Sequence, residues 1–388
     1  MTENNNRLIN LLELRGTYTT GGGPDKTILL SAEKHNKDLV NPVVVYLRDI
    51  NDDNFQIGQM AEGRGFKYIE VLDRSKIDIK CIIELNRIVK EYNIDIIHGH
   101  DYKTDMLAYI LGLIHSKVHL VSTAHGWITN SLKGNLYKWI HLRVLRRFEN
   151  LIAVSAATKE LMVASGIDAG RIKVIYNGID DKHWCNSDKH MSLRKELNIP
   201  EHSFVVGTVG RISNEKDYLT FLDVASAITD KIDDVYFAII GDGKGNEIKD
   251  LVKYAEKLGI KNKVLFTGYR SDLLNVYKTF DIFLMTSITE GLPNTMLEAM
   301  SMELPVVTTG VGGIPELLED GKSGFQYEVR DVDGLTGRIM DLISNNALRD
   351  QVSEAARKRI EAKFSFDKRL QIIEEYYQNI CLNKRKEQ

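Results

Sequence analysis

Short apolar runs alternate with longer amphipathic segments along the whole chain. In the first half, the apolar runs cover 9–14, 43–47, 68–71, 94–98, 119–122, 151–154 and 173–175. Most of the segments between them repeat apolar residues at helical spacing. This alternation predicts a parallel sheet that is covered by helices.

The same pattern starts again after a polar stretch at about 180–200. In the second half, the apolar runs cover 204–209, 236–240, 264–266, 282–285 and 305–307. We therefore predict an α/β protein with two Rossmann-like, doubly wound domains that face a central cleft. We place these domains at 1–183 and 184–366, followed by a C-terminal helical segment at 367–388.

Composition narrows the class of protein. The chain has 388 residues and a formal net charge of −3, which argues against a dedicated nucleic-acid-binding protein. The polar start at 1–6 lacks the apolar core of a signal peptide, and the apolar stretch at 107–113 is too short to span a bilayer. Cys81, Cys185 and Cys381 lie far apart, without metal-ligand spacing. We expect a cytoplasmic protein in a reducing compartment.

Charge is distributed unevenly between 103 and 148, where Asp105 is the only acidic residue. The basic residues of this segment are Lys103, Lys117, Lys133, Lys138, Arg143, Arg146 and Arg147. One interpretation is a solvated helix face, because Leu136, Ile140, Val144 and Phe148 form an apolar stripe. The alternative is a patch that contacts an anionic membrane or a polyanionic acceptor.

Ligands of open α/β sheets bind outside the carboxyl ends of the strands, so the loops that follow the apolar runs are the candidate sites. The loop Gly21-Gly-Gly-Pro24 follows the first run and precedes a predicted helix. Its glycines allow close backbone approach, and the helix start offers free N–H groups. We interpret it as a phosphate or acceptor loop, although a tight turn would also use glycine.

Two cations follow the run at 204–209. Arg211 comes directly after Gly210, and Lys216 lies five positions further on. A guanidinium fork and an ammonium at this spacing can converge on a diphosphate. The alternative is a surface loop with two unrelated cations.

Two carboxylates follow the run at 282–285, within Glu290-Gly-Leu-Pro-Asn-Thr-Met-Leu-Glu298. Glu290 falls on the strand-to-helix loop, and Glu298 falls in the first turns of the helix. Glu298 can accept hydrogen bonds from two ribose hydroxyls, and Glu290 can hold hydroxyls of a hexose. A structural alternative explains Glu298 alone, because Thr295-x-x-Glu298 also fits a capping box.

Three further positions lie at strand ends. His125, in Thr123-Ala-His-Gly126, is a candidate site residue, although a lone histidine is often only structural. His98-Gly-His100-Asp101 makes a poor metal site because no third ligand is visible at useful spacing. Tyr269 and Arg270 can flank a base ring, or they can simply lie at the margin of the core.

Taken together, these loops resemble the retaining glycosyltransferases of the GT-B fold, family four. The matching elements are Gly21–Gly23, Ala124-His-Gly126, Asn177-Gly-Ile-Asp180, Gly210-Arg211 with Lys216, Gly268-Tyr-Arg270, Glu290 to Glu298, Val311-Gly-Gly-Ile-Pro-Glu316 and Asp320-Gly-Lys-Ser-Gly324. These elements occur in the same order as in the family, and together they span nearly the whole chain. The set is specific, although no single element is.

The resemblance implies transfer of a sugar from a UDP- or GDP-linked hexose, with retention at the anomeric carbon. Arg211 and Lys216 would neutralise the leaving diphosphate, so that no metal ion or other cofactor is required. His125 and Glu290 would lie beside the transferred sugar. The implied donor-binding residues are Gly22, Gly23, Gly210, Tyr269, Arg270, Gly291, Leu292, Pro293, Asn294, Thr295 and Glu298.

The resemblance also implies that the first domain binds the acceptor, that the second binds the nucleotide-sugar, and that the helix from Asp367 returns to the first domain. We expect a glycan or lipid-linked acceptor at the inner face of the cell membrane, in cell-surface polysaccharide synthesis. Two alternatives remain: a nucleotide-sugar epimerase of the same architecture, and a noncatalytic protein that binds sugar nucleotides.

Overall fold

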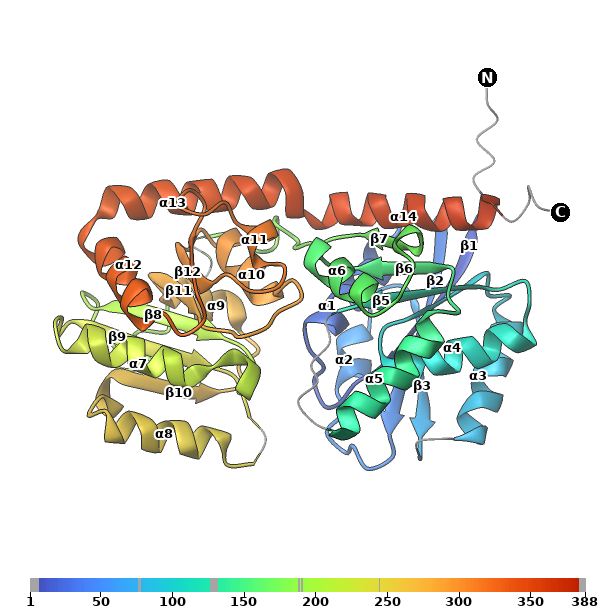
Figure 1. Ribbon diagram of the computed structural model, residues 1–388, viewed down its shortest axis with the longest axis horizontal. Helices are drawn as coiled ribbons and strands as arrows, with labels where there is room; N and C mark the ends of the chain where they lie inside the picture. The colour runs from blue at the N-terminus through green and yellow to red at the C-terminus, as the bar shows by residue number, and fades with distance from the viewer. Residues whose placement is uncertain are drawn as a thin grey trace, which may run out of the picture. The chain divides into compact units, whose positions relative to one another are not determined.

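The computed structural model describes residues 7–75, 78–125, 132–187, 189, 191–243 and 245–383. The chain divides into two compact units (Figure 1). Unit 1 comprises 1–177 and 367–388, and unit 2 comprises 178–366. The division therefore precedes the predicted boundary between 183 and 184. The reason is local, because Ile179 donates to the carbonyl oxygen of Phe364 and accepts from the amide of Phe366, which ties this segment to unit 2.

Unit 1 contains a seven-stranded parallel sheet with the order β3-β2-β1-β4-β5-β6-β7. The strands are β1 (Ile9–Gly16), β2 (Val40–Asp49), β3 (Lys67–Asp73), β4 (Ile96–Gly99), β5 (His119–Ala124), β6 (Asn150–Ala153) and β7 (Ile172–Val174). The helical elements are α1 (Gly23–Lys34), α2 (Ile57–Ala61), α3 (Ile79–Glu91), α4 (Tyr102–Ile114), α5 (Leu132–Leu145), α6 (Ala156–Ala164) and η1 (Ala169–Arg171). The strand order reverses between β1 and β4, as in a doubly wound sheet.

Unit 2 contains a six-stranded parallel sheet with the order β10-β9-β8-β11-β12-β13. The strands are β8 (Phe204–Val209), β9 (Val235–Ile240), β10 (Val264–Gly268), β11 (Ile282–Met285), β12 (Val306–Thr309) and β13 (Phe325–Tyr327). The helical elements are η2 (Asn214–Lys216), α7 (Tyr218–Thr229), α8 (Glu247–Lys257), η3 (Lys261–Lys263), α9 (Leu273–Thr279), α10 (Asn294–Ser301), α11 (Ile314–Leu317), α12 (Val332–Ser344), α13 (Asn346–Arg359) and η4 (Ile360–Phe364). Here the order reverses between β8 and β11, which places the ligand edge at the loops that follow them.

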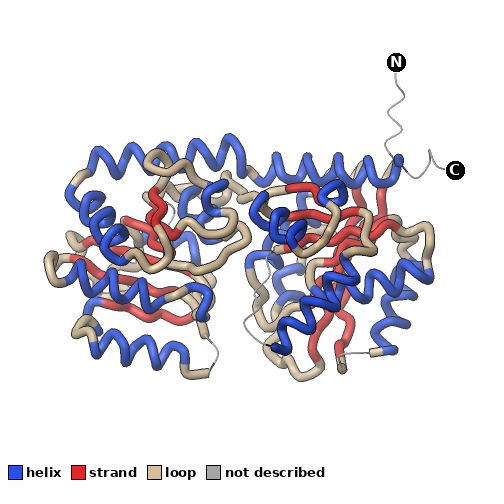
Figure 2. The backbone as a smooth tube through the Cα atoms, viewed as in Figure 1, coloured by secondary structure: helices blue, strands red, loops and turns tan. Residues whose placement is uncertain are grey.

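Helices lie beside the strands of each sheet in Figure 2, and local sequence explains where several of them begin. Asp78 caps α3 by accepting hydrogen bonds from the amides of Lys80 and Cys81, and Asp101 caps α4 in the same way. The apolar face of α3 then packs into the core of unit 1. None of the described helices combines the length and the apolar character needed to cross a membrane.

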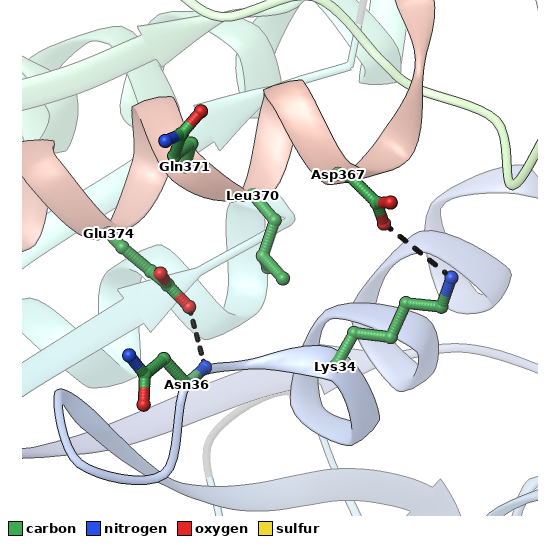
Figure 3. Close-up of a pocket in the computed structure, with 6 residues that line it drawn as sticks. All are labelled: Lys34, Asn36, Asp367, Leu370, Gln371 and Glu374. Atoms are coloured by element: carbon green, nitrogen blue, oxygen red, sulfur yellow. Dashed lines mark hydrogen bonds and ion pairs between the residues drawn. The ribbon is translucent and has the colours of Figure 1, made fainter.

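The last helix, α14 (Phe366–Asn383), belongs to unit 1 from Asp367 onward. Its Glu374 accepts hydrogen bonds from the amide of Asn36, at 2.8 Å, and pairs with Nδ1 of His35, at 2.9 Å. Figure 3 shows Glu374 and Asp367 pointing toward the chain at the end of α1. Ile373 and Tyr377 are buried on the same helix, so α14 completes the packing of unit 1.

Candidate active site

The clearest candidate site lies in unit 2, where the loops after β8 and β11 meet. These strands are neighbours in the sheet. Lys216, at the end of η2, donates a hydrogen bond from Nζ to Oε1 of Glu290 at 2.6 Å. Oγ of Ser287 donates to the same carboxylate oxygen at 2.7 Å. The structure thus brings together two predicted residues that are 74 positions apart.

Backbone contacts fix η2 against the loop that follows β11. The amide of Ile288 donates to the carbonyl oxygen of Glu215 at 2.9 Å, and Oγ1 of Thr286 donates to the carbonyl oxygen of Lys216 at 3.1 Å. Gly210 lies beside the lysine, since a Cβ there would be 3.5 Å from Cε of Lys216. The position of the Lys216 side chain is therefore set by two strand ends rather than by one flexible loop.

Arg211 is the more exposed of the two predicted cations. Its side chain is 60% exposed, and Nη2 donates to Oε1 of Glu215 at 2.7 Å. Burial raises the pKa of Glu215, but its own backbone amide and Arg211 outweigh this and lower the pKa below the usual value. Glu215 precedes Lys216 in the η2 turn. Lys216 is therefore part of this turn, and Arg211 is bound to it through Glu215.

Two glycines allow the site loops to pack closely. At Gly241, with φ +144°, a Cβ would be 2.0 Å from the carbonyl oxygen of Gly210. At Gly312, with φ +56°, a Cβ would be 1.8 Å from the carbonyl oxygen of Glu290. The amide of Gly313 also donates to the carbonyl oxygen of Gly291 at 2.9 Å. Any other residue at Gly241 or Gly312 would force these loops to move.

Helix α10 carries the second carboxylate of the predicted pair. Glu298 is 2% exposed, and Oε2 accepts a hydrogen bond from the hydroxyl of Tyr277 at 2.8 Å. The helix begins at Asn294, after Pro293, which makes no side-chain cap. Thr295 thus lies inside the helix, and its buried Oγ1 has no hydrogen-bond partner among the described residues. The capping-box interpretation of Thr295 and Glu298 is therefore wrong.

The remaining predicted residues of α10 and its preceding loop occupy the same edge. Leu292 is buried, with 4% exposure, and anchors the loop. Gly291 accepts the hydrogen bond from Gly313, and Asn294 begins the helix. The first N–H groups of a helix lack intrahelical partners, which favours negative charge at this end of α10.

Tyr269 and Arg270 follow β10, which is separated from β8 by β9. Tyr269 is 55% exposed, and its amide donates to Oδ1 of Asp242 at 3.0 Å. Arg270 binds the carboxylates of Asp272 and Glu196, and these hydrogen bonds raise its pKa. The Arg270 guanidinium is thus engaged by two acidic partners.

In unit 1, a buried aspartate braces the predicted glycine loop. Gly22 precedes α1, and its amide donates to Oδ2 of Asp25 at 2.6 Å; Gly23 is the first helical residue. Gly21 has φ +68°, and a Cβ there would be 2.7 Å from the same oxygen. Asp25 also binds the hydroxyl of Tyr46, at 3.1 Å. Sequence reasoning missed Asp25, whose only signal is its place in the first turn of a helix after three glycines.

His125 follows β5 in unit 1, and Gly126 lies outside the described residues. Nε2 of His125 is 3.3 Å from Nδ1 of His100, while its buried Nδ1 has no hydrogen-bond partner in the part of the chain that the structure describes. Burial, with smaller contributions from His100 and Arg15, lowers the pKa of His125 well below its usual range. The imidazole is therefore neutral near pH 7.

The sequence spacing shows no third ligand beside His98 and His100, but the structure brings Glu13 to them from another strand. Glu13 lies opposite His98 in the register of β1 and β4, and one ligand atom from each of Glu13, His98 and His100 fits within 4.8 Å. All three residues are buried. The carboxylate was missed because strand pairing, rather than sequence spacing, brings it to the histidines.

The basic segment is described only in part, because the side chains of Lys133, Leu136 and Lys138 lie outside the described residues. On α5, Trp139 is 53% exposed, and the guanidinium of Arg143 lies 4.1 Å from the centre of its ring. Phe148 and Leu145 are buried. The far end of α5 therefore shows both a core side and an exposed aromatic–basic surface.

Comparison with known proteins places the chain in a family. Residues 191–359 match the family described as Glycosyl transferases group 1, and residues 41–183 match Glycosyltransferase Family 4. The UDP-Gal:alpha-D-GlcNAc-diphosphoundecaprenol alpha-1,3-galactosyltransferase of Escherichia coli is 29% identical over 316 residues, which is 79% of this chain and 81% of the relative. The capsular polysaccharide biosynthesis glycosyltransferase CapM of Staphylococcus aureus is 25% identical over 298 residues, 74% of this chain and 77% of the relative.

The fold comparison agrees. The crystal structure of Anabaena Alr3699/HepE in complex with UDP-glucose has a TM-score of 0.85 at 22% identity, covering 96% of this chain and all of that one. The chain belongs to the group 1 glycosyltransferases of the family four type and has the GT-B fold. The predicted family and fold class are confirmed. Of the two relatives named above, one is named for transfer to a diphosphoundecaprenol-linked sugar and the other for capsular polysaccharide biosynthesis.

Proposed function

We propose that this protein is a retaining hexosyltransferase that moves a hexose from a UDP-linked donor to a lipid-linked glycan. The name of the Escherichia coli relative specifies a UDP-linked galactose and a diphosphoundecaprenol acceptor, and the Anabaena structure contains UDP-glucose. The name of CapM places that relative in capsular polysaccharide biosynthesis. These relatives favour UDP over the GDP-linked donors that the sequence left open.

The observation that carries this proposal is the Lys216–Glu290 pair at the edge of β8 and β11. The departing diphosphate gains negative charge as the bond to the sugar breaks, and a fixed ammonium lowers the barrier most when water is excluded. A diphosphate would compete with Glu290 for Nζ of Lys216. The released carboxylate of Glu290 would then accept hydrogen bonds from hydroxyls of the hexose. Arg211, which precedes η2 and binds Glu215 of that turn, would add a second cation, so the proposal requires no metal ion.

Helix α10 would hold the rest of the nucleotide. Its free N–H groups favour a phosphate, and the buried carboxylate of Glu298 can accept hydrogen bonds from vicinal ribose hydroxyls. The buried Oγ1 of Thr295, which has no partner within the described ranges, is available for a polar group of the donor. In this proposal, unit 2 binds the nucleotide-sugar and unit 1 supplies His125 and the acceptor surface.

Release of nucleoside diphosphate tests the proposal directly. The full-length protein would be incubated with UDP- and GDP-hexoses and a polyprenyl-diphosphate sugar, and the product would be identified by mass and by the anomeric coupling in its NMR spectrum. We expect a glycosylated acceptor with the donor's anomeric configuration. Lys216→Ala and Arg211→Ala should each reduce turnover on the order of 100-fold. Undiminished turnover in both variants would rule out the phosphate clamp, and conversion of the free sugar nucleotide would indicate an epimerase.

The exposed surface of α5 supports a further part of the proposal, which is peripheral contact with anionic membrane. A shallow pocket there is lined by Tyr109, Trp139, Ile140, Arg143, Val144 and Arg147. Indole rings suit the membrane interface, and basic side chains are attracted to anionic headgroups. The protein should sediment with phosphatidylglycerol vesicles at low salt, and the double variant Trp139→Ala/Arg143→Ala should sediment less. Binding that is insensitive to salt and to lipid charge would contradict this part.

A further inference from the structure

Three strands and the C-terminal helix surround a buried polar network in unit 1. Its central group is the carboxylate of Glu13 on β1, which is 2% exposed. Oε2 of Glu13 lies 2.5 Å from Nε2 of His100 and 3.3 Å from Nδ1 of His98. Tyr377 of α14 places its hydroxyl 2.7 Å from Nδ1 of His98. Such a network is costly to bury unless its members satisfy one another.

The protonation of this network follows from burial and charge. Burial raises the pKa of Glu13, but His98 and His100 outweigh it and hold the pKa well below the usual range. Burial, together with His98, lowers the pKa of His100 to about 4. At neutral pH, Glu13 is thus an ionised acceptor and His100 is a neutral imidazole. One nitrogen of His100 must donate, and the other must accept.

The direction of each hydrogen bond is then fixed. A carboxylate can only accept, so Nε2 of His100 carries the hydrogen that faces Glu13. Nδ1 of His100 is left as the acceptor, and it faces Nε2 of His125 at 3.3 Å. His125 must therefore carry its hydrogen on Nε2. Its Nδ1 holds a lone pair, and this buried atom has no partner in the described part of the chain.

We propose that Glu13 and His100 are positioning residues that hold His125 in the Nε2–H tautomer, so that its Nδ1 accepts a hydrogen bond from a substrate hydroxyl. The hydroxyl belongs either to the transferred hexose or to the acceptor glycan. A buried acceptor without a partner costs free energy, and a hydroxyl donor relieves that cost. This inference rests on the proposed function for the identity of the substrate, but the tautomer follows from unit 1 alone.

A metal ion is the competing explanation for the same cluster, and the distances disfavour it. Bonds to zinc are about 2.0 Å long, which keeps tetrahedral ligand atoms roughly 3.3 Å apart. Oε2 of Glu13 and Nε2 of His100 are 2.5 Å apart, which suits a hydrogen bond instead. Both nitrogens of His98 already have partners, in Tyr377 and in Oγ1 of Thr123 at 2.7 Å.

The first test reads the tautomer itself in the full-length protein. Imidazole ¹⁵N shifts would be recorded near pH 7.5 on protein labelled at histidine, with His125→Gln used to assign the resonance. We expect the Nε2–H tautomer for His125 in the wild type, and loss of this single state in Glu13→Leu and His100→Phe. Thr123→Val alters the network beyond His98 and should leave the signal unchanged. An Nδ1–H tautomer in the wild type, or one zinc ion per chain by elemental analysis, would overturn the inference.

The second test uses kinetics to identify the hydroxyl. Glu13→Leu and His100→Phe should each lower kcat/KM about tenfold or more, as expected for one lost hydrogen bond in a buried site. Singly deoxygenated donors and acceptors would be compared in wild type and His100→Phe. The analogue that lacks the contacting hydroxyl should show no further loss of kcat/KM in His100→Phe, because the variant has already lost that contact. Whether this analogue is a donor or an acceptor identifies the substrate that supplies the hydroxyl. If the loss from each missing hydroxyl simply adds to the loss from His100→Phe for every substrate, the proposed contact between His125 and a substrate hydroxyl would be overturned. If no substrate is turned over, the proposed function fails, while the tautomer remains measurable.

If one variant does not fold, the other carries both tests, because each interrupts the same chain of hydrogen bonds. Melting temperatures of the variants would be measured first. A variant that folds, loses the tautomer and keeps full activity with every substrate would show that the network is only structural. That result would contradict the positioning role.

Discussion

At the scale of single residues, unit 1 and unit 2 use buried polar groups in different ways. Lys216 and Glu290 form a pair that a ligand can divide, with side chains 20% and 11% exposed. Glu13 and His100, in contrast, are closed off from solvent and bind each other. The first pair is suited to exchange partners, and the second is suited to hold a neighbour in place.

The buried histidines should make stability fall in acid. The unfolded chain protonates His100 below its usual pKa of 6.5, whereas the folded state resists protonation down to about pH 4. The unfolded state therefore binds more protons in this window, and the free energy of unfolding decreases as the pH falls from 6.5 toward 4. The full effect of such a shift is roughly 3 kcal/mol.

Urea unfolding at a series of pH values measures this dependence. His100→Phe should show a shallower loss of stability between pH 6.5 and 4 than the wild type. His202→Ala, which removes an exposed histidine, should follow the wild-type curve. Parallel curves for the wild type and His100→Phe would show that His100 does not remain neutral in the folded state.

At the scale of elements, the site depends on how closely the loops after strands pack. The sequence predicted the strands that carry these loops, since their apolar runs are visible without a structure. It also predicted Lys216, Glu290 and Glu298, because charged residues after a buried strand are conspicuous. It could not predict Glu13, Asp25 or Gly241, whose roles depend on contacts across strands or across loops. Likewise, the capping-box alternative failed because α10 begins two residues earlier than that alternative requires, with Pro293 rather than Thr295 at the cap position.

Gly312→Ala should displace the loop that carries Glu290. A Cβ at Gly312 would meet the carbonyl oxygen of Glu290 at 1.8 Å, so the two loops must separate. We expect turnover to fall at least tenfold, since catalytic groups must be held within fractions of an ångström. Gly321→Ala is the matched control, because Gly321 also has positive φ, at +72°, but no atom of the described residues lies within 4 Å of the added Cβ.

Comparing these alanine variants separates crowding from backbone strain. Both should lose some stability, measured as the melting temperature, because alanine disfavours positive φ. Only Gly312→Ala should lose its affinity for a UDP-hexose. Equal effects of the two substitutions on binding would show that close loop packing does not position Glu290.

At the scale of the whole molecule, the chain leaves unit 1 at Asn177 and returns to it at Asp367. The first domain is therefore completed only by the last helix, and its polar network includes Tyr377 from that helix. The C-terminal segment thus contributes to the surroundings of His125, although it is the most distant part of the sequence.

Tyr377→Ala should destabilise unit 1. The side chain is fully buried, and removal of a large aromatic residue from a core costs about 3–5 kcal/mol. Urea unfolding followed by circular dichroism would measure the change. Ile372→Ala, on the same helix but 42% exposed, should cost far less. Similar losses for both variants would show that α14 is not an integral part of the unit 1 core.

The most direct test of the central claim is calorimetric titration of UDP and uridine into the wild type and Lys216→Met. If the edge of β8 and β11 binds the diphosphate, the wild type should bind UDP much more tightly than uridine. Lys216→Met should weaken UDP binding by about ten- to a hundredfold, as for a lost hydrogen bond to a charged group, and leave uridine unaffected. Equal affinity of both proteins for UDP would contradict the account.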